Sequence, residues 1–482
     1  MKKAPEHELL KSTLIGIVAL VALISWLVFQ PRLPDQEPRE KIGKKLFDNF
    51  NDLSKMTKIE FQGIDPETGE LRELILTRDG QEWRLPSLSG FPAENAERLS
   101  KVIAPLTQLS ILDVVDETTR IHDSQKITDF HRECGLINPS SYDIEHSFEK
   151  NTDGKKSLFN DAALHVHIEG EGGETLFDLL IGNRVPESSA TRDDRFVRIP
   201  NEEVVYTADF VGDSTQETSA SELAEYPMRI SFEPLDWLDR DLLRISRWDV
   251  LYLTARDYSF SIQKDKNEIH IANYQTSGVA VFKQTPENSM SRIWSLNRLI
   301  TRNEKGKWDE TTIFDPESAN NESLNLLADE FGKLNIVDVR KKPTALAALF
   351  RANNIGTQLA PLAAPLSEFG FALDDHDPLA PERIEPFLIG EGGSIELTMK
   401  TGVKLSLVFG KKFENKRAVL VYASYSRDAL AATSGDESEV DFLEPEAKQK
   451  ATIKNNRFAD WFYLIDESDY EKLSFKTANT LK

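Results

Sequence analysis

Residues 164–182, LHVHIEGEGGETLFDLLIG, determine the predicted fold more directly than any other stretch of the chain. Apolar and polar side chains alternate on both sides of a glycine-rich turn, which is typical of an antiparallel β-hairpin with one buried face. Residues 395–410, IELTMKTGVKLSLVFG, show the same pattern around a Thr-Gly turn. Their final glycines, Gly182 and Gly410, are 228 positions apart. The sequence therefore predicts the same hairpin twice.

Two other landmarks recur at almost the same spacing. Trp83 and Trp308 are 225 positions apart, and so are Asp113 and Asp338. In both places the spacing of apolar residues predicts an amphipathic helix between the tryptophan and the aspartate, the first over residues 93–109. Agreement between several landmarks predicts an internal duplication.

Each copy is predicted to close with further strands. Residues 196–199 and 204–206 are matched to residues 461–465 and Tyr470. The second copy also contains an acidic insert near residues 434–446. Its composition predicts a disordered or solvated segment.

The resulting prediction is an α+β protein, in which an N-terminal transmembrane helix precedes two related domains of mainly antiparallel sheet with packed helices. Residues 1–30 are predicted to form a cytoplasmic tail and transmembrane anchor, and residues 31–50 a proline-containing spacer. The first repeat domain spans residues 51–235 and the second spans residues 236–482.

The anchor prediction rests on residues 12–29, which contain no charged side chain. A helix of this length nearly spans the hydrocarbon core of a bilayer. A cleavable signal peptide would need small residues after the apolar run, whereas this run ends in Trp-Leu-Val-Phe-Gln-Pro. The short N-terminal tail favours a cytoplasmic N-terminus, although positive charges flank both ends of the segment.

Composition excludes several classes of function. The 482 residues carry a formal net charge of −22, which repels nucleic-acid phosphates. Cys134 is the single cysteine, so an internal disulfide framework and a cysteine-rich zinc or iron–sulfur site are excluded.

His165 and His167 form the strongest candidate metal site in the sequence. On a strand they share one face with Glu169, and side chains in this arrangement bind metals in many strand-borne sites. The same pattern is also that of an ordinary half-exposed strand. The second copy has Glu396 and Thr398 in the comparable strand, with no pair of histidines. We therefore predict no metal site and no cofactor.

Other polar motifs favour structural interpretations. Residues 374–377, Asp-Asp-His-Asp, lack the glycine and distal glutamate of a helix–loop–helix calcium site and predict a solvated turn. Residues 169–173 lack the Gly-Lys ending of a phosphate loop and predict a hairpin turn. Asp239 and Asp241 could form an acid–base pair, but close carboxylates are expected among 80 acidic residues. No nucleophile or zinc-protease motif is present, so we predict no catalytic residue.

The aromatic residues and the cysteine are predicted to have packing roles. Trp83, Trp237, Trp248 and Trp308 are expected in cores or at the junction of the domains. Cys134, next to a glycine, is expected to be a small buried apolar residue.

Short motifs follow one another over nearly the whole chain: Trp83-Arg84-Leu85, Cys134-Gly135-Leu136-Ile137-Asn138-Pro139, Ile181-Gly182, Trp237-Leu238-Asp239-Arg240-Asp241-Leu242-Leu243, Arg340-Lys341-Lys342-Pro343, Glu368-Phe369-Gly370-Phe371 and Arg457-Phe458-Ala459-Asp460-Trp461. In this order they resemble a bacterial family, domain of unknown function 4340, in the anchored two-copy form found in planctomycetes. Asn138 departs from the family, which more often has an acidic residue there.

The resemblance implies an extracytoplasmic accessory role, because the family's genes are associated with ABC-type export systems and a gliding-motility-type auxiliary protein. We therefore predict a non-enzymatic accessory or scaffold subunit at the bacterial inner membrane, with its soluble region in the periplasm. Two alternatives stay open: a periplasmic module that binds or senses a polysaccharide or peptide, and a hydrolase with an unrecognised site.

Overall fold

The structure is a computed structural model of the 482-residue chain. It describes residues 36–48, 50, 52–65, 68–93, 96–115, 123–142, 161–186, 193–210, 230–265, 268–286, 292–302, 308–311, 319–353, 357–374, 379, 386–434 and 436–474.

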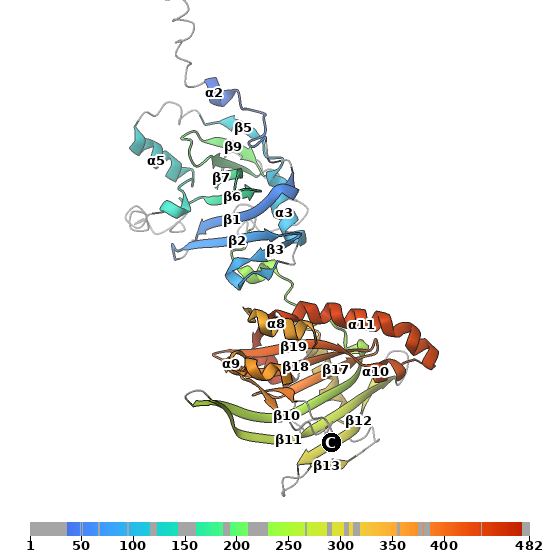
Figure 1. The fold of residues 1–482 in the computed structure, drawn as a ribbon. Helices are drawn as coiled ribbons and strands as arrows, with labels where there is room; N and C mark the ends of the chain where they lie inside the picture. Colours follow the sequence, from blue (N-terminus) through green and yellow to red (C-terminus); the bar gives the residue numbers. More distant parts are fainter. Residues whose placement is uncertain are drawn as a thin grey trace, which may run out of the picture. The chain divides into compact units, whose positions relative to one another are not determined.

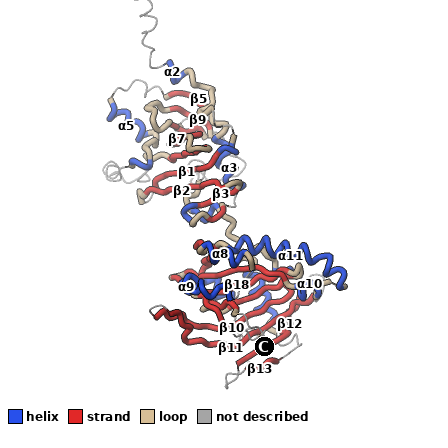
Figure 2. The backbone as a smooth tube through the Cα atoms, viewed as in Figure 1, coloured by secondary structure: helices blue, strands red, loops and turns tan. Residues whose placement is uncertain are grey.

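The chain divides into two compact units, and each contains one large sheet with helices (Figures 1 and 2), except that residues 85, 91 and 92 of the first sheet are part of the second unit. The first unit comprises Met1–Arg84 and Ala93–Pro234, and the second comprises Leu85–Pro92 and Leu235–Lys482. The paired strands of both sheets are mostly antiparallel, so the predicted α+β class is confirmed.

The first sheet has nine strands in the order β4-β3-β2-β1-β6-β7-β8-β9-β5. Helix α3 (Ala96–Leu106) precedes β5, and helix α5 (Ser124–Glu133) follows it. The strands are β1 (Met56–Ile64), β2 (Leu71–Asp79), β3 (Glu82–Leu85), β4 (Phe91–Pro92), β5 (Ile111–Val114), β6 (Leu164–Gly170), β7 (Thr175–Arg184), β8 (Asp194–Arg198) and β9 (Tyr206–Asp209).

The second sheet has nine strands in the order β13-β12-β11-β10-β17-β18-β19-β20-β14. A separate two-stranded sheet pairs β15 (Phe371–Asp374) with β16 (Phe387–Gly390). The nine strands are β10 (Val250–Asp265), β11 (Glu268–Pro286), β12 (Arg292–Arg302), β13 (Trp308–Thr311), β14 (Asp338–Lys341), β17 (Ser394–Met399), β18 (Val403–Phe413), β19 (Lys416–Tyr425) and β20 (Trp461–Asp466).

The two sheets have the same strand order once β15 and β16 are set aside. The irregularities of pairing also coincide. The register of β7 and β8 shifts between Ile181 and Arg184, and that of β18 and β19 shifts between Phe409 and Lys412, 228 positions later. A β-bulge releases backbone groups from the ladder, so it marks a specific local geometry and not only a general strand pattern.

Each of these bulges accommodates a crossing segment. At the first, the N–H of Asn183 donates to the carbonyl of Cys134 at 2.9 Å; at the second, the N–H of Lys411 donates to the carbonyl of Phe369 at 2.9 Å. Glycine precedes the donor in both, because a Cβ on Gly182 would lie 2.3 Å from the Cys134 oxygen. The predicted equivalence of the two hairpin glycines therefore has a steric basis.

Among the described residues, the second unit contains six α-helices. Helix α7 (Asn321–Phe331) occupies the place in the chain that α3 has in the first unit. The remaining helices are α8 (Thr344–Arg351), α9 (Ala363–Glu368), α10 (Arg427–Ala431), α11 (Glu437–Ala459) and α12 (Glu467–Leu473).

Residues 437–446 of the acidic insert lie in helix α11, so the disordered alternative predicted for residues 434–446 is wrong; most of these residues are exposed, as the solvated alternative predicted. Asp436 caps helix α11 by accepting from the N–H of Ser438, and the buried side of the helix packs on β19 and α8. Arg427 offsets part of the acidic charge, because its guanidinium pairs with Asp441 at 2.7 Å and with Glu444. The prediction failed because composition alone did not show the residues that α11 buries.

Two of the proposed landmark matches are also wrong. Trp83 lies on β3 and Trp308 on β13, which occupy different positions in the strand order. Residues 196–199 lie mostly in β8, whose counterpart is β19 and not β20. Tyr470 lies in helix α12 rather than in a strand.

The described part of the predicted spacer, residues 31–50, begins with helix α2 (Gln36–Arg39). Beyond the helix, the N–H of Gly43 donates to the carbonyl of Ile111 at 2.8 Å, and Phe50 is buried. This part of the chain therefore belongs to the first unit.

The predicted anchor, residues 12–29, lies outside the described residues. Among the helices that the structure describes, none is both long enough and apolar enough to cross a membrane.

Lys342, just after β14, is a buried cation at the end of helix α11. Its Nζ donates to the carbonyls of Phe458 and Ala459, both at 3.1 Å, and lies 4.1 Å from the centre of the Phe350 ring. Burial lowers the pKa of Lys342 from 10.5 to about 7, and the charge of Asp460 opposes this shift.

The lowered pKa of Lys342 predicts a specific dependence of stability on pH. Between pH 7 and 10.5 the unfolded chain binds a proton at Lys342 that the folded chain has lost. The contribution of Lys342 to the unfolding free energy therefore rises with pH, on the order of 2 kcal/mol between pH 7 and 9. Urea unfolding of the wild type and Lys342→Met at both pH values measures it. Lys341→Met, at an exposed position, is the control and should keep the wild-type dependence of the unfolding free energy on pH. If Lys342→Met also kept the wild-type dependence, the prediction would be contradicted.

Candidate functional site

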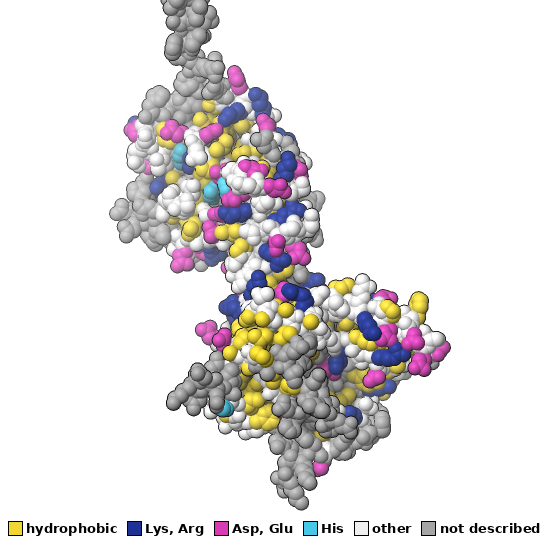
Figure 3. Space-filling view, viewed as in Figure 1, with side chains coloured by type: hydrophobic (Ala, Val, Ile, Leu, Met, Phe, Trp, Pro, Cys, Tyr) yellow, Lys and Arg dark blue, Asp and Glu magenta, His cyan; other side chains and the backbone are white. Residues whose placement is uncertain are grey.

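The most concentrated group of chemically active side chains lies on one face of β1, β6 and β7. Antiparallel register places Gln62 opposite His165 and places His167 opposite both Glu60 and Asp178. The alternate residues of β6 are buried, as the sequence pattern predicted. Figure 3 shows histidine side chains among acidic and basic ones on the visible face of this unit.

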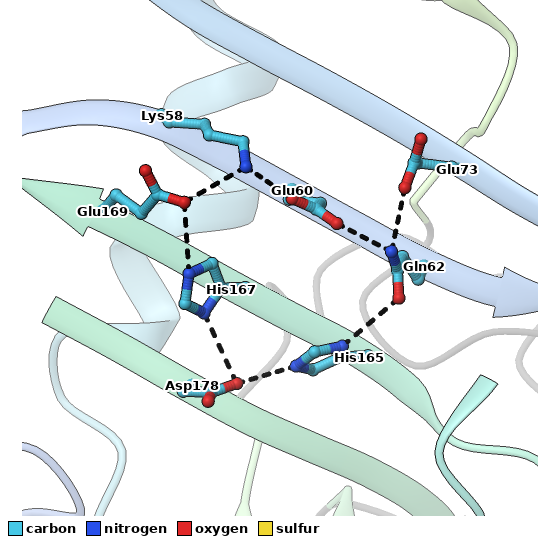
Figure 4. Close-up of polar contacts among 8 residues, drawn as sticks. All are labelled: Lys58, Glu60, Gln62, Glu73, His165, His167, Glu169 and Asp178. Carbon is cyan, nitrogen blue, oxygen red and sulfur yellow. Dashed lines mark hydrogen bonds and ion pairs between the residues drawn. The ribbon is translucent and has the colours of Figure 1, made fainter. Parts of the chain in front are cut away.

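Both imidazoles converge on one carboxylate oxygen (Figure 4). Nε2 of His165 lies 2.7 Å from Oδ1 of Asp178, and Nδ1 of His167 lies 3.5 Å from the same oxygen. On the outer side, Nε2 of His167 lies 3.4 Å from Oε1 of Glu169. The side chains of His165, His167 and Asp178 are 15%, 22% and 24% exposed, so solvent reaches a site that the sheet holds in place.

Neighbouring residues fix the orientation of Gln62. Its amide nitrogen donates to Glu60 at 2.7 Å and to Glu73 at 2.8 Å, which leaves its oxygen 3.5 Å from Nδ1 of His165. Lys58 lies 2.8 Å from Glu60 and 3.1 Å from Glu169. The hydrogen bond with Glu60 is the largest cause of the raised pKa of Lys58, ahead of the opposing effect of burial.

Three of these side chains could hold a metal ion. Donor atoms of His165, His167 and Asp178 all lie within 4.8 Å of one another. Sequence reasoning found the two histidines but chose Glu169 as the third member and missed Asp178. The sequence did predict the hairpin in which Asp178 lies opposite His167. Asp178 was missed because the pairing register of the two strands was not known.

The second unit does not repeat this chemistry. By strand pairing, Ser394 and Glu396 hold the places of His165 and His167, and Ser406 holds that of Asp178. The predicted counterparts were Glu396 and Thr398, so Glu396 was placed correctly on this strand and Thr398 was not.

A cavity of about 260 Å³ lies beside Ser394 in the second unit. Arg256, Glu391, Phe409 and Tyr470 contribute to its lining. Its volume is below the range of about 300–1,000 Å³ that is usual for small-molecule sites. Its mixture of one cation, carboxylates and aromatic rings does not identify a reaction.

The other polar candidates have structural roles or lie outside the described residues. Asp239 accepts from the N–H of Asp241 at 3.0 Å, and Asp241 accepts from the N–H of Arg244 at 2.8 Å, so both stabilise a loop. Residues 375–377 of the predicted acidic turn lie outside the described part. The hairpin turn predicted at residues 169–173 is present, and residues 171–174 connect β6 to β7.

The packing predictions for tryptophan and cysteine have mixed outcomes. Trp237 is 1% exposed and Cys134 is 3% exposed, so both are core residues as expected. Trp248 is 40% exposed, with the guanidinium of Arg247 4.4 Å from its ring centre, so its prediction as a core or junction residue is wrong.

Comparison of the chain with protein-family models, curated proteins and solved structures finds no match. The resemblance to the domain of unknown function 4340 family therefore stays a prediction.

Proposed function

We propose that this chain is a non-enzymatic accessory subunit that works by contact with other membrane components, most specifically the subunits of an ABC-type export system. The observation that carries the proposal is that both sheets have the same order of nine strands. Structural features of the sheets recur in both units, whereas the polar side chains of the histidine cluster have no equivalent at the matching positions of the second sheet. We infer that the two units arose by internal duplication.

The repeated features support this inference because they belong to the framework of the two sheets. Asp113 and Asp338 each accept a hydrogen bond from the next residue's N–H at 2.8 Å. Tyr206 and Tyr463, at matching positions in β9 and β20, are both 1% exposed. Since fold alone does not specify function, the segments that differ between the copies are where a specific contact is expected.

Helix α11 is such a segment, because it is inserted between β19 and β20 of the second unit. Phe442 and Ile453 on this helix are 82% and 62% exposed. They are eleven residues apart, about three helical turns, so they lie on the same side of the helix. Large exposed apolar side chains on a protein of net charge −22 suit a contact with an apolar surface of a partner.

Anchoring would favour such a contact. The apolar segment at residues 12–29 is proposed to tether the soluble units on the periplasmic side of the inner membrane. Tethering raises the effective concentration of both units for neighbouring membrane proteins. A gliding-motility-type auxiliary protein is a further proposed partner.

Purification of the tagged full-length protein in a gentle detergent tests the proposal. We expect permease or ATPase subunits of an ABC-type exporter to co-purify, identified by mass spectrometry. Recovery should fall about tenfold or more in the double variant Phe442→Ser and Ile453→Ser, because interface residues of this kind contribute more than 1 kcal/mol each.

The control replaces Glu171 and Glu174, exposed residues between β6 and β7 of the first unit, with serine; because these positions lie outside α11, recovery should be unchanged. A second control replaces Asp178 with asparagine. A protein that purifies without exporter subunits would contradict the proposal. The proposal would also be contradicted if Asp178→Asn abolished co-purification while the Phe442→Ser and Ile453→Ser double variant did not.

A further inference from the structure

We propose that His165, His167 and Asp178 form a binding site for one divalent transition-metal ion, of which Zn²⁺ is the representative. The site goes beyond the accessory function, since the equivalent positions of the second unit hold Ser394, Glu396 and Ser406. Two ligands come from one strand and the third comes from its neighbour, so the sheet fixes all three.

The hydrogen-bonding geometry favours an ion between the three side chains. All four imidazole nitrogens of His165 and His167 face oxygens: two face Oδ1 of Asp178, one faces Oε1 of Gln62 and one faces Oε1 of Glu169. A neutral imidazole has only one N–H, so in each ring one nitrogen would direct a lone pair at an acceptor. A cation between the rings and Asp178 removes this conflict.

The same geometry separates ligands from supporting groups. The ion would take Nε2 of His165 and Nδ1 of His167, the two nitrogens that face Asp178. The remaining N–H groups would then donate to Gln62 and Glu169, the arrangement that orients histidine ligands in metal sites. Gln62 is itself fixed by Glu60 and Glu73, so its oxygen is available to accept.

The distances and charges agree with this assignment. Ligand atoms around a tetrahedral zinc ion lie about 3.3 Å apart. The two ring-to-carboxylate distances are 2.7 and 3.5 Å, so small side-chain shifts suffice. The surroundings are acidic, because Lys58 is one ammonium among the carboxylates of Glu60, Glu73, Glu169 and Asp178.

The donor set indicates the class of metal. Imidazole nitrogen suits zinc, copper, nickel and iron, whereas calcium and magnesium prefer oxygen ligands alone. Three protein ligands with partial exposure leave a further coordination position for water.

Isothermal titration of the chelator-treated full-length protein with Zn²⁺ tests the proposal. We expect one saturable site whose affinity falls about 100-fold or more in His165→Ala, His167→Ala and Asp178→Asn. Gln62→Leu should weaken binding about tenfold, because it removes the oxygen that faces Nδ1 of His165. Co²⁺ should give visible absorption bands that the His167 variant lacks.

Two controls make the outcome decisive. His270→Ala removes an exposed histidine of the second unit, and Glu396→Ala changes the counterpart of His167; both should bind Zn²⁺ like the wild type. Circular dichroism should show the same sheet content in every variant, because the altered side chains lie on the half-exposed face. Absence of a saturable Zn²⁺ site would overturn the proposal. So would a site that survives both histidine substitutions, or one lost equally in His270→Ala.

Discussion

Replacing Gly410 with alanine is expected to lower the free energy of unfolding of the second unit by about 3 kcal/mol or more. An alanine Cβ would lie 2.1 Å from the carbonyl oxygen of Phe369, a backbone atom that no rotamer change can move away. Moving the crossing segment would in turn lengthen the bond from the Lys411 N–H to that oxygen, 2.9 Å in the structure. Chemical denaturation followed by tryptophan fluorescence measures the effect.

The equivalent change in the first unit, Gly182→Ala, should have a similar effect on that unit's transition, because its Cβ would lie 2.3 Å from the Cys134 oxygen. Gly80→Ala is the matched control: Gly80 has φ of +63° but nothing within 4 Å of its Cβ, so only about 1 kcal/mol of backbone strain is expected. Equal destabilisation by Gly410→Ala and Gly80→Ala would contradict the prediction, because it would show that the close approach of the Phe369 carbonyl does not require a glycine at position 410.

The second large effect is expected for Asn455→Leu, at about 2–3 kcal/mol of lost stability. Strand β19 pairs with β20 only up to Val419, and beyond that residue the Oδ1 of Asn455 accepts from the N–H of Ala423 at 3.1 Å. The amide nitrogen of Asn455 donates to the carbonyl of Phe350 at 2.6 Å. Leucine would leave the buried N–H of Ala423 without this acceptor.

Asn456→Leu provides the control for Asn455→Leu, since it makes the same chemical change at the adjacent exposed position of α11. Its expected effect is within about 0.5 kcal/mol. Hydrogen exchange at Ala423 gives a local measurement, because that amide should exchange faster in the Asn455 variant alone. Equal stability of the two variants would show that α11 does not depend on this contact.

The parts of the fold that were predictable from sequence are those specified by local pattern. Alternating residues around Gly170 and around Gly402 predicted two hairpins, and both are present. The spacing of Asp113 and Asp338 also identified true counterparts, because each side chain accepts a hydrogen bond from the backbone N–H of the residue that follows it. Local patterns were sufficient here because the interactions themselves are local.

The errors came from matches that depend on long-range pairing. Trp83 and Trp308 share residue type and spacing, but β3 and β13 differ in strand position, which a sequence without register does not reveal. Helix α11 was missed because its buried side is made by small residues such as Ala447 and Ala451, whose burial depends on β19. Asp178 was missed for a related reason, since its approach to the histidines depends on a single residue of hairpin register.

Contact between α11 and an export system is most directly tested by site-specific photo-crosslinking in native membranes. A photoreactive amino acid is placed at Phe442 of the full-length chain, and at Glu171 in the β6–β7 turn as the control. We expect an adduct between position 442 and an ABC-type exporter subunit, with no such adduct from position 171. Absence of adducts from position 442, or the same adducts from both positions, would contradict the proposed function.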